Sequence, residues 1–368
     1  MINILHVTYD MRIGGTEMVI KNIIEGSDSN RFCMSIFCIE DTLGPWGVDL
    51  QSKGIEVNSY SRKPGFDWGL IRRLREVIAM QNIHIVHCHQ YSPWVYGAIA
   101  SSLLGVKVIF TEHGRFYPDS TNFKRRLVNP LILKLTDAVT AISNATRLAL
   151  NEFEFIKLDK VKVIYNGIAP LKSSPMLSRK LKKSLGITEG EQVIGTISRF
   201  DPIKNHKMLL SAFHLLLQKN ERVKLLIVGD GEERANIESI IRTLGLENKV
   251  ILTGYQKNPT EFLSLMNIFL LPSLSEGTSM TLLEAMSLGK PCVVTDAGGN
   301  SEIVIDDETG KVTSNDVAQE FAQAISTLLD SPLLMAKMSK NASLKFAKSF
   351  RESVMNKRYS DLYEELIC

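Results

Sequence analysis

Two glutamates eight residues apart are the first candidates for chemistry. Within residues 272–286, Glu276 is expected to precede a helix whose first turn contains residues 277–279. The free N–H groups of such a turn can bind an anion. Glu284 would lie about two turns further on, ~12 Å along the axis, so one carboxylate could reach a sugar beside a phosphate and the other a more distant ribose. Alternatively, Glu276 caps its helix and Glu284 is a solvated charge, and the spacing leaves both interpretations open.

Two cations occupy a loop in the same half of the chain. Arg199 follows an apolar run that ends at Ser198, and Lys204 stands just before a helical pattern that begins at His206. Cations at the end of a strand can clamp a diphosphate and neutralise the charge that develops when it departs. The alternative is a surface loop with two ordinary basic residues.

Near the N-terminus, Gly14 and Gly15 follow the first apolar run and open a helical pattern. Glycines at this position let backbone N–H groups approach an anion, and the helix dipole favours phosphate there. The pair lacks the G-x-G-x-x-G pattern of dinucleotide sites. A plain tight turn is therefore the alternative.

Three histidines of the first half could suggest a metal site, and a fourth, His113, has a different context. His87 and His89 lie two residues apart, so they share one face of a strand that also includes His84. No Asp-x-Asp or H-E-x-x-H motif accompanies them, and we therefore predict no metal site. His113 ends another strand and is followed by Gly114, which makes it either a polar strand end or a functional group at the edge of a sheet.

Short apolar runs alternate with helical patterns along the chain, which predicts parallel sheets covered by helices on both faces. A turn-rich stretch at 166–175 separates two such series. We predict two doubly wound domains, residues 1–168 with a terminal helix at about 350–368, and residues 169–349. Ligands of such sheets bind beyond the carboxyl ends of the strands, here in a cleft between the domains. The expected strands are 2–8, 32–39, 83–89, 106–111, 138–143, 161–165, 192–198, 223–228, 250–252, 268–271 and 291–295, and the expected helices are 16–25, 68–80, 96–104, 124–135, 206–218, 232–244, 281–288 and 351–366.

Composition excludes several classes of protein. The 368 residues contain 43 Lys and Arg against 40 Asp and Glu, a net charge of +3 that is too small for a general nucleic-acid binder. The five cysteines form no C-x-x-C pair, which favours reduced thiols in a cytosolic protein. No apolar run reaches the ~18 residues of a membrane span, and the N-terminus does not resemble a signal peptide.

Taken in order, these motifs resemble the retaining family 4 glycosyltransferases, which have the GT-B fold. The resemblance rests on the Gly-Gly loop, the stretch from Ser198 to His206, the Gly-Asp-Gly at 229–231, and Glu276 with Glu284. It implies two Rossmann-like domains facing a central cleft, with the last helix crossing back to the first domain. Where family members often have Gly-Phe-Gly after the first glutamate, this chain has Gly277-Thr278-Ser279-Met280, so the preferred donor sugar stays open.

The resemblance also implies roles for individual residues. The second domain would bind a nucleotide-sugar donor and the first an acceptor. Arg199, Lys204 and the N–H groups of Gly277, Thr278 and Ser279 would bind the donor diphosphate, and the loop at Gly14 and Gly15 would close over its β-phosphate. Glu276 would contact the hexose hydroxyls, and Glu284 would contact the ribose. His113 would lie near the donor sugar and the reacting centre, and Tyr255 with Gly254 would lie near the nucleobase.

The activity implied is retaining transfer of a hexosyl unit from a UDP- or GDP-sugar, without a cofactor or metal. The acceptor would be a glycan or lipid-linked hydroxyl in the synthesis of lipopolysaccharide, O-antigen, capsule or exopolysaccharide, at the cytoplasmic face of the inner membrane. The first half of the chain carries the cationic excess, which suits an anionic lipid acceptor or membrane. The candidate acceptor residues are Arg115, Lys124, Arg125 and Arg126.

Three other classes compete with this interpretation. A nicotinamide-dependent dehydrogenase should show G-x-G-x-x-G, which neither half contains. A UDP-sugar epimerase with the same two-domain shape would turn over donor without acceptor. A non-catalytic scaffold would bind nucleotide-sugar without turnover.

Overall fold

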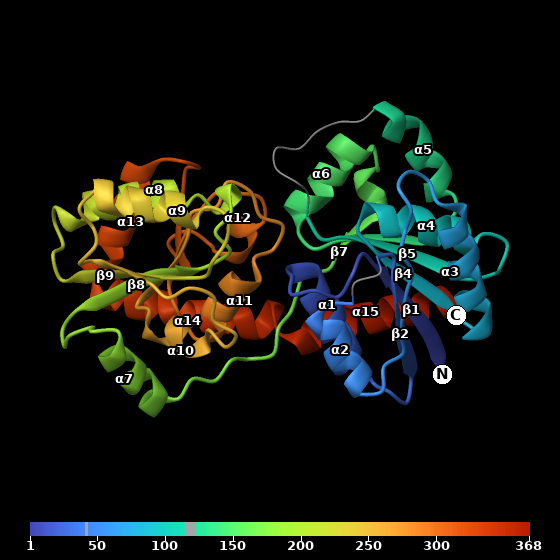
Figure 1. Ribbon diagram of the computed structural model, residues 1–368, viewed down its shortest axis with the longest axis horizontal. Coiled ribbons are helices and arrows are strands. Elements are labelled where there is room, and N and C mark those ends of the chain that lie inside the picture. The colour runs from blue at the N-terminus through green and yellow to red at the C-terminus, as the bar shows by residue number, and fades with distance from the viewer. Residues whose placement is uncertain (41–42, 115–122) are drawn as a thin grey trace. The chain divides into compact units, whose positions relative to one another are not determined.

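The computed structural model describes residues 1–40, 43–114 and 123–368. The chain forms two compact units (Figure 1). Unit 1 comprises Met1–Gly167 and Glu352–Cys368, and unit 2 comprises Ile168–Arg351. Among the described residues, no helix is long and apolar enough to cross a membrane.

Unit 1 is built on a seven-stranded parallel sheet in the order β3-β2-β1-β4-β5-β6-β7. Helices α1, α2 and α15 cover one face, and α3, α4 and α5 lie on the other (Figure 1). The strands are β1 (Ile2–Thr8), β2 (Phe32–Cys38), β3 (Val57–Ser59), β4 (Ile85–His89), β5 (Lys107–Glu112), β6 (Ala138–Ala141) and β7 (Val161–Val163), and the helices are α1 (Gly15–Gly26), α2 (Pro45–Ser52), α3 (Trp68–Met80), α4 (Tyr91–Ser101), α5 (Phe123–Leu133), α6 (Asn144–Glu154) and α15 (Glu352–Ile367).

Unit 2 has a six-stranded parallel sheet in the order β10-β9-β8-β11-β12-β13. Helices α8, α9 and α13 pack on one face, and α10, α11 and α14 lie on the other (Figure 1). The strands are β8 (Gln192–Ile197), β9 (Val223–Val228), β10 (Val250–Leu252), β11 (Ile268–Leu271), β12 (Cys292–Thr295) and β13 (Gly310–Thr313), and the helices are α7 (Pro175–Ser184), α8 (His206–Leu217), α9 (Arg234–Thr243), α10 (Thr260–Leu265), α11 (Met280–Ser287), α12 (Asn300–Ile303), α13 (Ala318–Leu329) and α14 (Pro332–Ser349).

Both sheets are doubly wound, which confirms the predicted fold class. Central strands such as β4 and β11 are buried throughout and apolar in most positions, as a sheet covered on both faces requires. In each unit the strand order reverses once, between β1 and β4 and between β8 and β11. Loops that follow the two strands at such a reversal diverge, and ligands of this fold class bind in the crevice between them.

The last helix returns to unit 1, as predicted. The Tyr363 hydroxyl of α15 lies 2.9 Å from Nδ1 of His87 on β4, and both side chains are fully buried. The Asn356 side chain donates to the backbone carbonyl of Asn22 on α1 at 3.1 Å. These contacts tie α15 to the sheet and to the helix beside it.

Several element predictions were wrong. Helix α4 begins at Tyr91, five residues before the predicted 96, directly after Gln90, which has a φ of 71°. The sequence analysis missed the short edge strands β3 and β13 and the helices α2, α6, α7, α10, α12, α13 and α14. Cys33 and Cys368 are exposed, so only three of the five thiols belong to the core.

The hydrogen bond between Tyr363 and His87 generates a prediction for stability. Tyr363→Phe leaves Nδ1 of His87 buried without a partner, which costs about 1–3 kcal/mol. The unfolding transition of unit 1, followed by calorimetry, should move down by several degrees, at roughly 2–4 °C per kcal/mol.

Tyr359→Phe is the matched control for this change. Tyr359 is equally buried on α15, but its hydroxyl makes no well-formed hydrogen bond with any residue that the structure describes. Its removal should lower the transition much less. Equal losses in the two variants would contradict the importance of the contact between Tyr363 and His87.

Candidate active site

The loops that follow β8 and β11 meet at the strand-order reversal of unit 2. After β8, the Asp201 side chain accepts from the Ile203 N–H at 3.0 Å and starts a short 3-10 helix, Pro202–Lys204. Asn205 has a φ of 50° and caps α8 by accepting from the Met208 N–H. These caps fix the backbone on both sides of Lys204.

Lys204 and Glu276 form a direct ion pair across this reversal. Nζ of Lys204 lies 2.6 Å from Oε1 of Glu276, and the Ser273 hydroxyl donates to the same oxygen at 2.7 Å. The two side chains are only 24% and 9% exposed. The structure thus joins two residues that the sequence analysis assigned to neighbouring groups of one ligand.

Helix α11 begins at Met280, one residue before the expected helix 281–288 but after the residues 277–279 that were expected in its first turn. Its N-cap is Ser279, whose hydroxyl accepts from the Leu282 N–H, so Gly277 and Thr278 lie in the preceding loop. The expectation that residues 277–279 form the first turn was therefore wrong. The alternative in which Glu276 caps the helix is also wrong, since the Glu276 carboxylate is bound by Lys204 and Ser273.

Glu284 is half-buried on α11, which excludes the interpretation as a solvated helix charge. Burial raises the pKa of its carboxyl group to about 7. The carboxylate makes no hydrogen bond or ion pair with any residue that the structure describes. It is a polar group placed where a hydrogen-bonding ligand would be favoured.

Arg199 and Tyr255 are much more exposed. The Arg199 guanidinium pairs with Asp201 of its own loop, and its side chain is 74% exposed. Tyr255 follows β10 and is 60% exposed. Neither side chain forms a hydrogen bond or ion pair with Lys204 or Glu276.

In unit 1, Gly14 is the N-cap of α1 and provides no side-chain cap. The Glu17 carboxylate folds back over it, so that a Cβ atom at Gly14 would overlap Oε2 of Glu17. Burial, aided by the negative charge of Asp10, raises the pKa of Glu17 to about 7. The sequence analysis did not single out Glu17, although an acidic residue three positions after an N-cap is a known capping signal.

His113 belongs to a row of histidines at the other reversal. Its Nε2 lies 2.8 Å from Nδ1 of His89, and Nε2 of His89 lies 3.0 Å from Nδ1 of His6. Burial lowers the pKa of His6 and of His113 to about 3, so both are neutral at pH 7. The sequence analysis missed His6, which only the pairing of β1 with β4 brings to this place.

The nitrogen atoms of His6, His87 and His89 lie within 4.8 Å of one another, a spacing that could hold a metal ion. Both nitrogens of His87 are already engaged, with Thr111 at 2.7 Å and with Tyr363 at 2.9 Å. Hydrogen bonds thus account for the arrangement. His84 lies apart from it and accepts from the Asn3 N–H.

The candidate acceptor cations have different surroundings. Arg115 lies outside the described residues. Arg125 pairs with the buried Glu154 and stacks 4.6 Å over the Tyr91 ring, so it has a structural role. Lys124 and Arg126 are exposed on α5.

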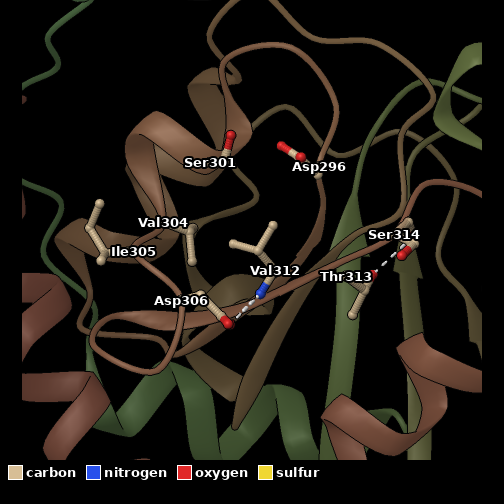
Figure 2. Close-up of a pocket in the computed structure, with 8 residues that line it drawn as sticks. All are labelled: Asp296, Ser301, Val304, Ile305, Asp306, Val312, Thr313 and Ser314. Atoms are coloured by element: carbon tan, nitrogen blue, oxygen red, sulfur yellow. Dashed lines mark hydrogen bonds between the residues drawn. The ribbon is translucent and has the colours of Figure 1, made fainter.

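Figure 2 shows a pocket of about 410 Å³ at the edge of unit 2, beside α12 and β13. None of the predicted donor-binding residues lines it. Asp296 and Asp306 contribute two carboxylates to its wall, which would repel a diphosphate. The lining residues are Asp296, Ser301, Val304, Ile305, Asp306, Val312, Thr313 and Ser314.

Comparisons with known proteins identify the family of this chain. Residues 13–170 match the family described as Glycosyltransferase Family 4, and residues 178–345 match Glycosyl transferases group 1. The chain is 31% identical to the N-acetyl-alpha-D-glucosaminyl L-malate synthase of Bacillus anthracis over 85% of this chain and 83% of that protein. It is 26% identical to the UDP-Gal:alpha-D-GlcNAc-diphosphoundecaprenol alpha-1,3-galactosyltransferase of Escherichia coli over 100% of this chain and 97% of that protein.

Solved structures give the same result for the fold. Anabaena Alr3699/HepE in complex with UDP superposes with a TM-score of 0.87 at 24% identity and covers 99% of both chains. A glycosyltransferase from Rickettsia africae ESF-5 also reaches 0.87, at 21% identity, over 100% of this chain and 98% of its own. With two matching family models and a relative above 30% identity, the chain belongs to the group 1 (family 4) glycosyltransferases of the GT-B fold.

Proposed function

We propose that this glycosyltransferase moves a hexosyl unit, with retention of configuration, from a UDP- or GDP-sugar to a hydroxyl of a glycan or lipid-linked acceptor in the synthesis of a cell-surface polysaccharide. The observation that carries the proposal is the pairing of Lys204 with Glu276 at the strand-order reversal of unit 2. Similarity to the Escherichia coli galactosyltransferase, whose name includes a diphosphoundecaprenol-linked sugar, supports the substrate class.

In this proposal Lys204 and Glu276 exchange partners when the donor binds. The ammonium group of Lys204 then pairs with the diphosphate of the donor, because two phosphate charges attract it more strongly than one carboxylate does. Glu276, still held by Ser273, then accepts hydrogen bonds from hexose hydroxyls. Arg199 contributes a second cation, and the N–H groups of residues 277–279 contribute further donors.

In this proposal the remaining donor contacts come from residues of both units. Glu284, whose carboxylate has no partner among the described residues, accepts from the ribose hydroxyls. Tyr255 lies against the nucleobase. In unit 1, the N–H groups at Gly14 and Gly15 approach the β-phosphate once the Glu17 carboxylate has moved aside.

The chemical step needs no protein nucleophile. The acceptor oxygen forms a bond to the anomeric carbon on the face from which the diphosphate leaves, and the departing phosphate oxygen takes the acceptor proton. Lys204, Arg199 and the loop N–H groups stabilise the charge that grows on the leaving group. These groups supply that stabilisation without a metal ion.

A screen for the donor tests the function itself. Thermal stability is measured with UDP, GDP, ADP and their sugar conjugates, and a ligand at a hundred times its Kd stabilises by ~2.7 kcal/mol. Product analysis with and without acceptor then separates the alternatives: an epimerase converts the donor sugar alone, and a scaffold binds without turnover. Failure of every nucleotide to stabilise the protein would contradict the proposal.

Lys204→Ala should lower kcat/KM for transfer at least a hundredfold, which corresponds to ~2.7 kcal/mol. It should also abolish the thermal shift produced by the nucleoside diphosphate, because the main cation of the site is lost. Lys207→Ala, an exposed change in the first turn of α8, is the control and should behave like the native protein. A folded Lys204→Ala variant with near-native kcat/KM would remove Lys204 from the site.

The backbone at Glu276 is held by two glycines. The Gly299 N–H donates to the Glu276 carbonyl at 3.0 Å, and Gly298, with a φ of 55°, packs so tightly that a Cβ atom would overlap that carbonyl oxygen. Any side chain at residue 298 must therefore push the loop of Glu276 away.

Gly298→Ala should consequently lower kcat/KM by about tenfold or more, because displacements of about 1 Å at a reacting centre have large effects. Gly245→Ala is the matched control: Gly245 has a φ of 66°, but open space surrounds its Cβ position. The control carries the same backbone strain without the clash. Similar kinetics for the two variants would show that the position of the Glu276 loop is unimportant.

Contact with an anionic membrane is part of the proposal and involves the outer face of α5. Leu127, Val128 and Leu131 are exposed there, and Lys124 and Arg126 are exposed on the same helix. Apolar side chains bordered by cations suit a surface helix that lies on anionic lipid at the cytoplasmic face of a membrane.

Flotation with vesicles checks this contact. The protein should bind vesicles that contain anionic phospholipid, and the double change Leu127→Ser and Leu131→Ser should weaken binding by about tenfold or more. Leu333→Ser, at a still more exposed leucine on α14, is the control. Equal flotation with neutral and anionic vesicles would refute a charge-assisted contact.

A further inference from the structure

We infer that His89 is a positioning residue that holds His113 in the tautomer with a proton on Nδ1, so that His113 donates a hydrogen bond to an oxygen of the bound ligand. The contact with ligand rests on the proposed function, whereas the tautomer is a property of unit 1 alone. His6 completes the arrangement.

The rings of His6, His89 and His113 form one hydrogen-bonded row from the centre of the sheet to its edge. His6 lies on β1, His89 ends β4, and His113 follows the adjacent β5. Each inner contact joins one ring nitrogen to one ring nitrogen, from His6 Nδ1 to His89 Nε2 and from His89 Nδ1 to His113 Nε2. His6 and His89 are fully buried.

Because the three imidazoles are neutral, this row allows only two arrangements of its protons. Each ring carries one N–H and one lone pair, and each inner hydrogen bond needs one of each. If His6 donates from Nδ1, then His89 must donate from Nδ1 and His113 must carry its proton on Nδ1. If the direction is reversed, all three protons lie on Nε2.

The two outer nitrogens of the row decide between these arrangements. Nε2 of His6 and Nδ1 of His113 are buried, and neither has a hydrogen-bond partner among the described residues. A buried N–H without an acceptor is rarer in proteins than a buried acceptor without a donor. The inner end at His6 is therefore better left as a lone pair, which places every proton on Nδ1.

The outer end then becomes a hydrogen-bond donor. His113 stands beyond the end of β5, at the carboxyl edge of the sheet where ligands of this fold class bind. An oxygen of the ligand accepts from Nδ1–H of His113, and every ring N–H of the row from His6 to His113 then has a partner. His87 is outside this row, because Tyr363 and Thr111 engage its two nitrogens.

The decisive experiment is nitrogen-15 NMR of the full chain labelled at its seven histidines. Long-range nitrogen–proton correlations distinguish protonated from unprotonated ring nitrogens, and single histidine variants assign the signals. We expect His6, His89 and His113 all to carry the proton on Nδ1. Protonation of His113 on Nε2 would overturn the inference.

Two variants of His89 test its positioning role. His89→Asn retains an amide N–H that can donate to Nε2 of His113, whereas His89→Leu cannot donate. We expect His89→Leu to lower kcat/KM by about tenfold and to shift the His113 signals towards a mixture of tautomers, and His89→Asn to recover most of both. The exposed His84→Gln is the control and should change neither.

The outcomes separate this inference from the proposed function. Equal kcat/KM and equal His113 signals in His89→Leu and His89→Asn would refute positioning by His89. Protonation on Nδ1 together with full activity of His113→Ala would leave the tautomer in place and refute the contact of His113 with the ligand, whereas failure of the proposed function would appear as absence of transfer in the native protein.

Discussion

The pairing of Lys204 with Glu276 depends on one constraint, the reversal of strand order between β8 and β11. On either side of a reversal, the chain leaves the sheet towards opposite faces, and ligands of this fold class bind beyond the strand ends at that point. An amine and a carboxylate this poorly exposed stabilise each other only when they are paired and hydrogen-bonded. Ser273 and the tight packing of Gly298 against Glu276 complete that arrangement. A ligand that competes for Lys204 must therefore offer more charge than Glu276 does.

The reversal in unit 1, between β1 and β4, carries different side chains. There the row from His6 to His113 consists of imidazoles whose pKa values burial lowers, and the buried Glu112 carboxylate accepts from the His113 backbone N–H. Uncharged rings need hydrogen bonds but no counter-ion, so they can lie deeper in the sheet than the ion pair of unit 2. The same topology thus supports a charged site in one unit and a neutral relay of hydrogen bonds in the other.

The sequence was informative where one segment determines its own structure. Apolar runs identified the central strands, and the residues around Glu276 marked the loop after β11. It was less informative where contacts between distant segments decide. Lys204 and Glu276 are 72 positions apart, and His6 resembles any polar residue in a strand until β4 is placed beside it. Residues 277–279 were wrongly assigned to the first turn of α11, and only the three-dimensional contacts show that Ser279 is its cap and that Glu276 is bound by Lys204 and Ser273.

The return of α15 makes unit 1 discontinuous in the chain, with all of unit 2 inserted between its two parts. During synthesis, every strand of both sheets leaves the ribosome before Tyr359 and Tyr363 do. Because domains fold as units while the chain grows, unit 2 is able to fold while unit 1 still lacks one of its covering helices. Until that helix arrives, the face of β4 that carries His87 stays open to water and to other chains. Unit 1 therefore completes the cover of its sheet only with α15, after every element of unit 2 has been made.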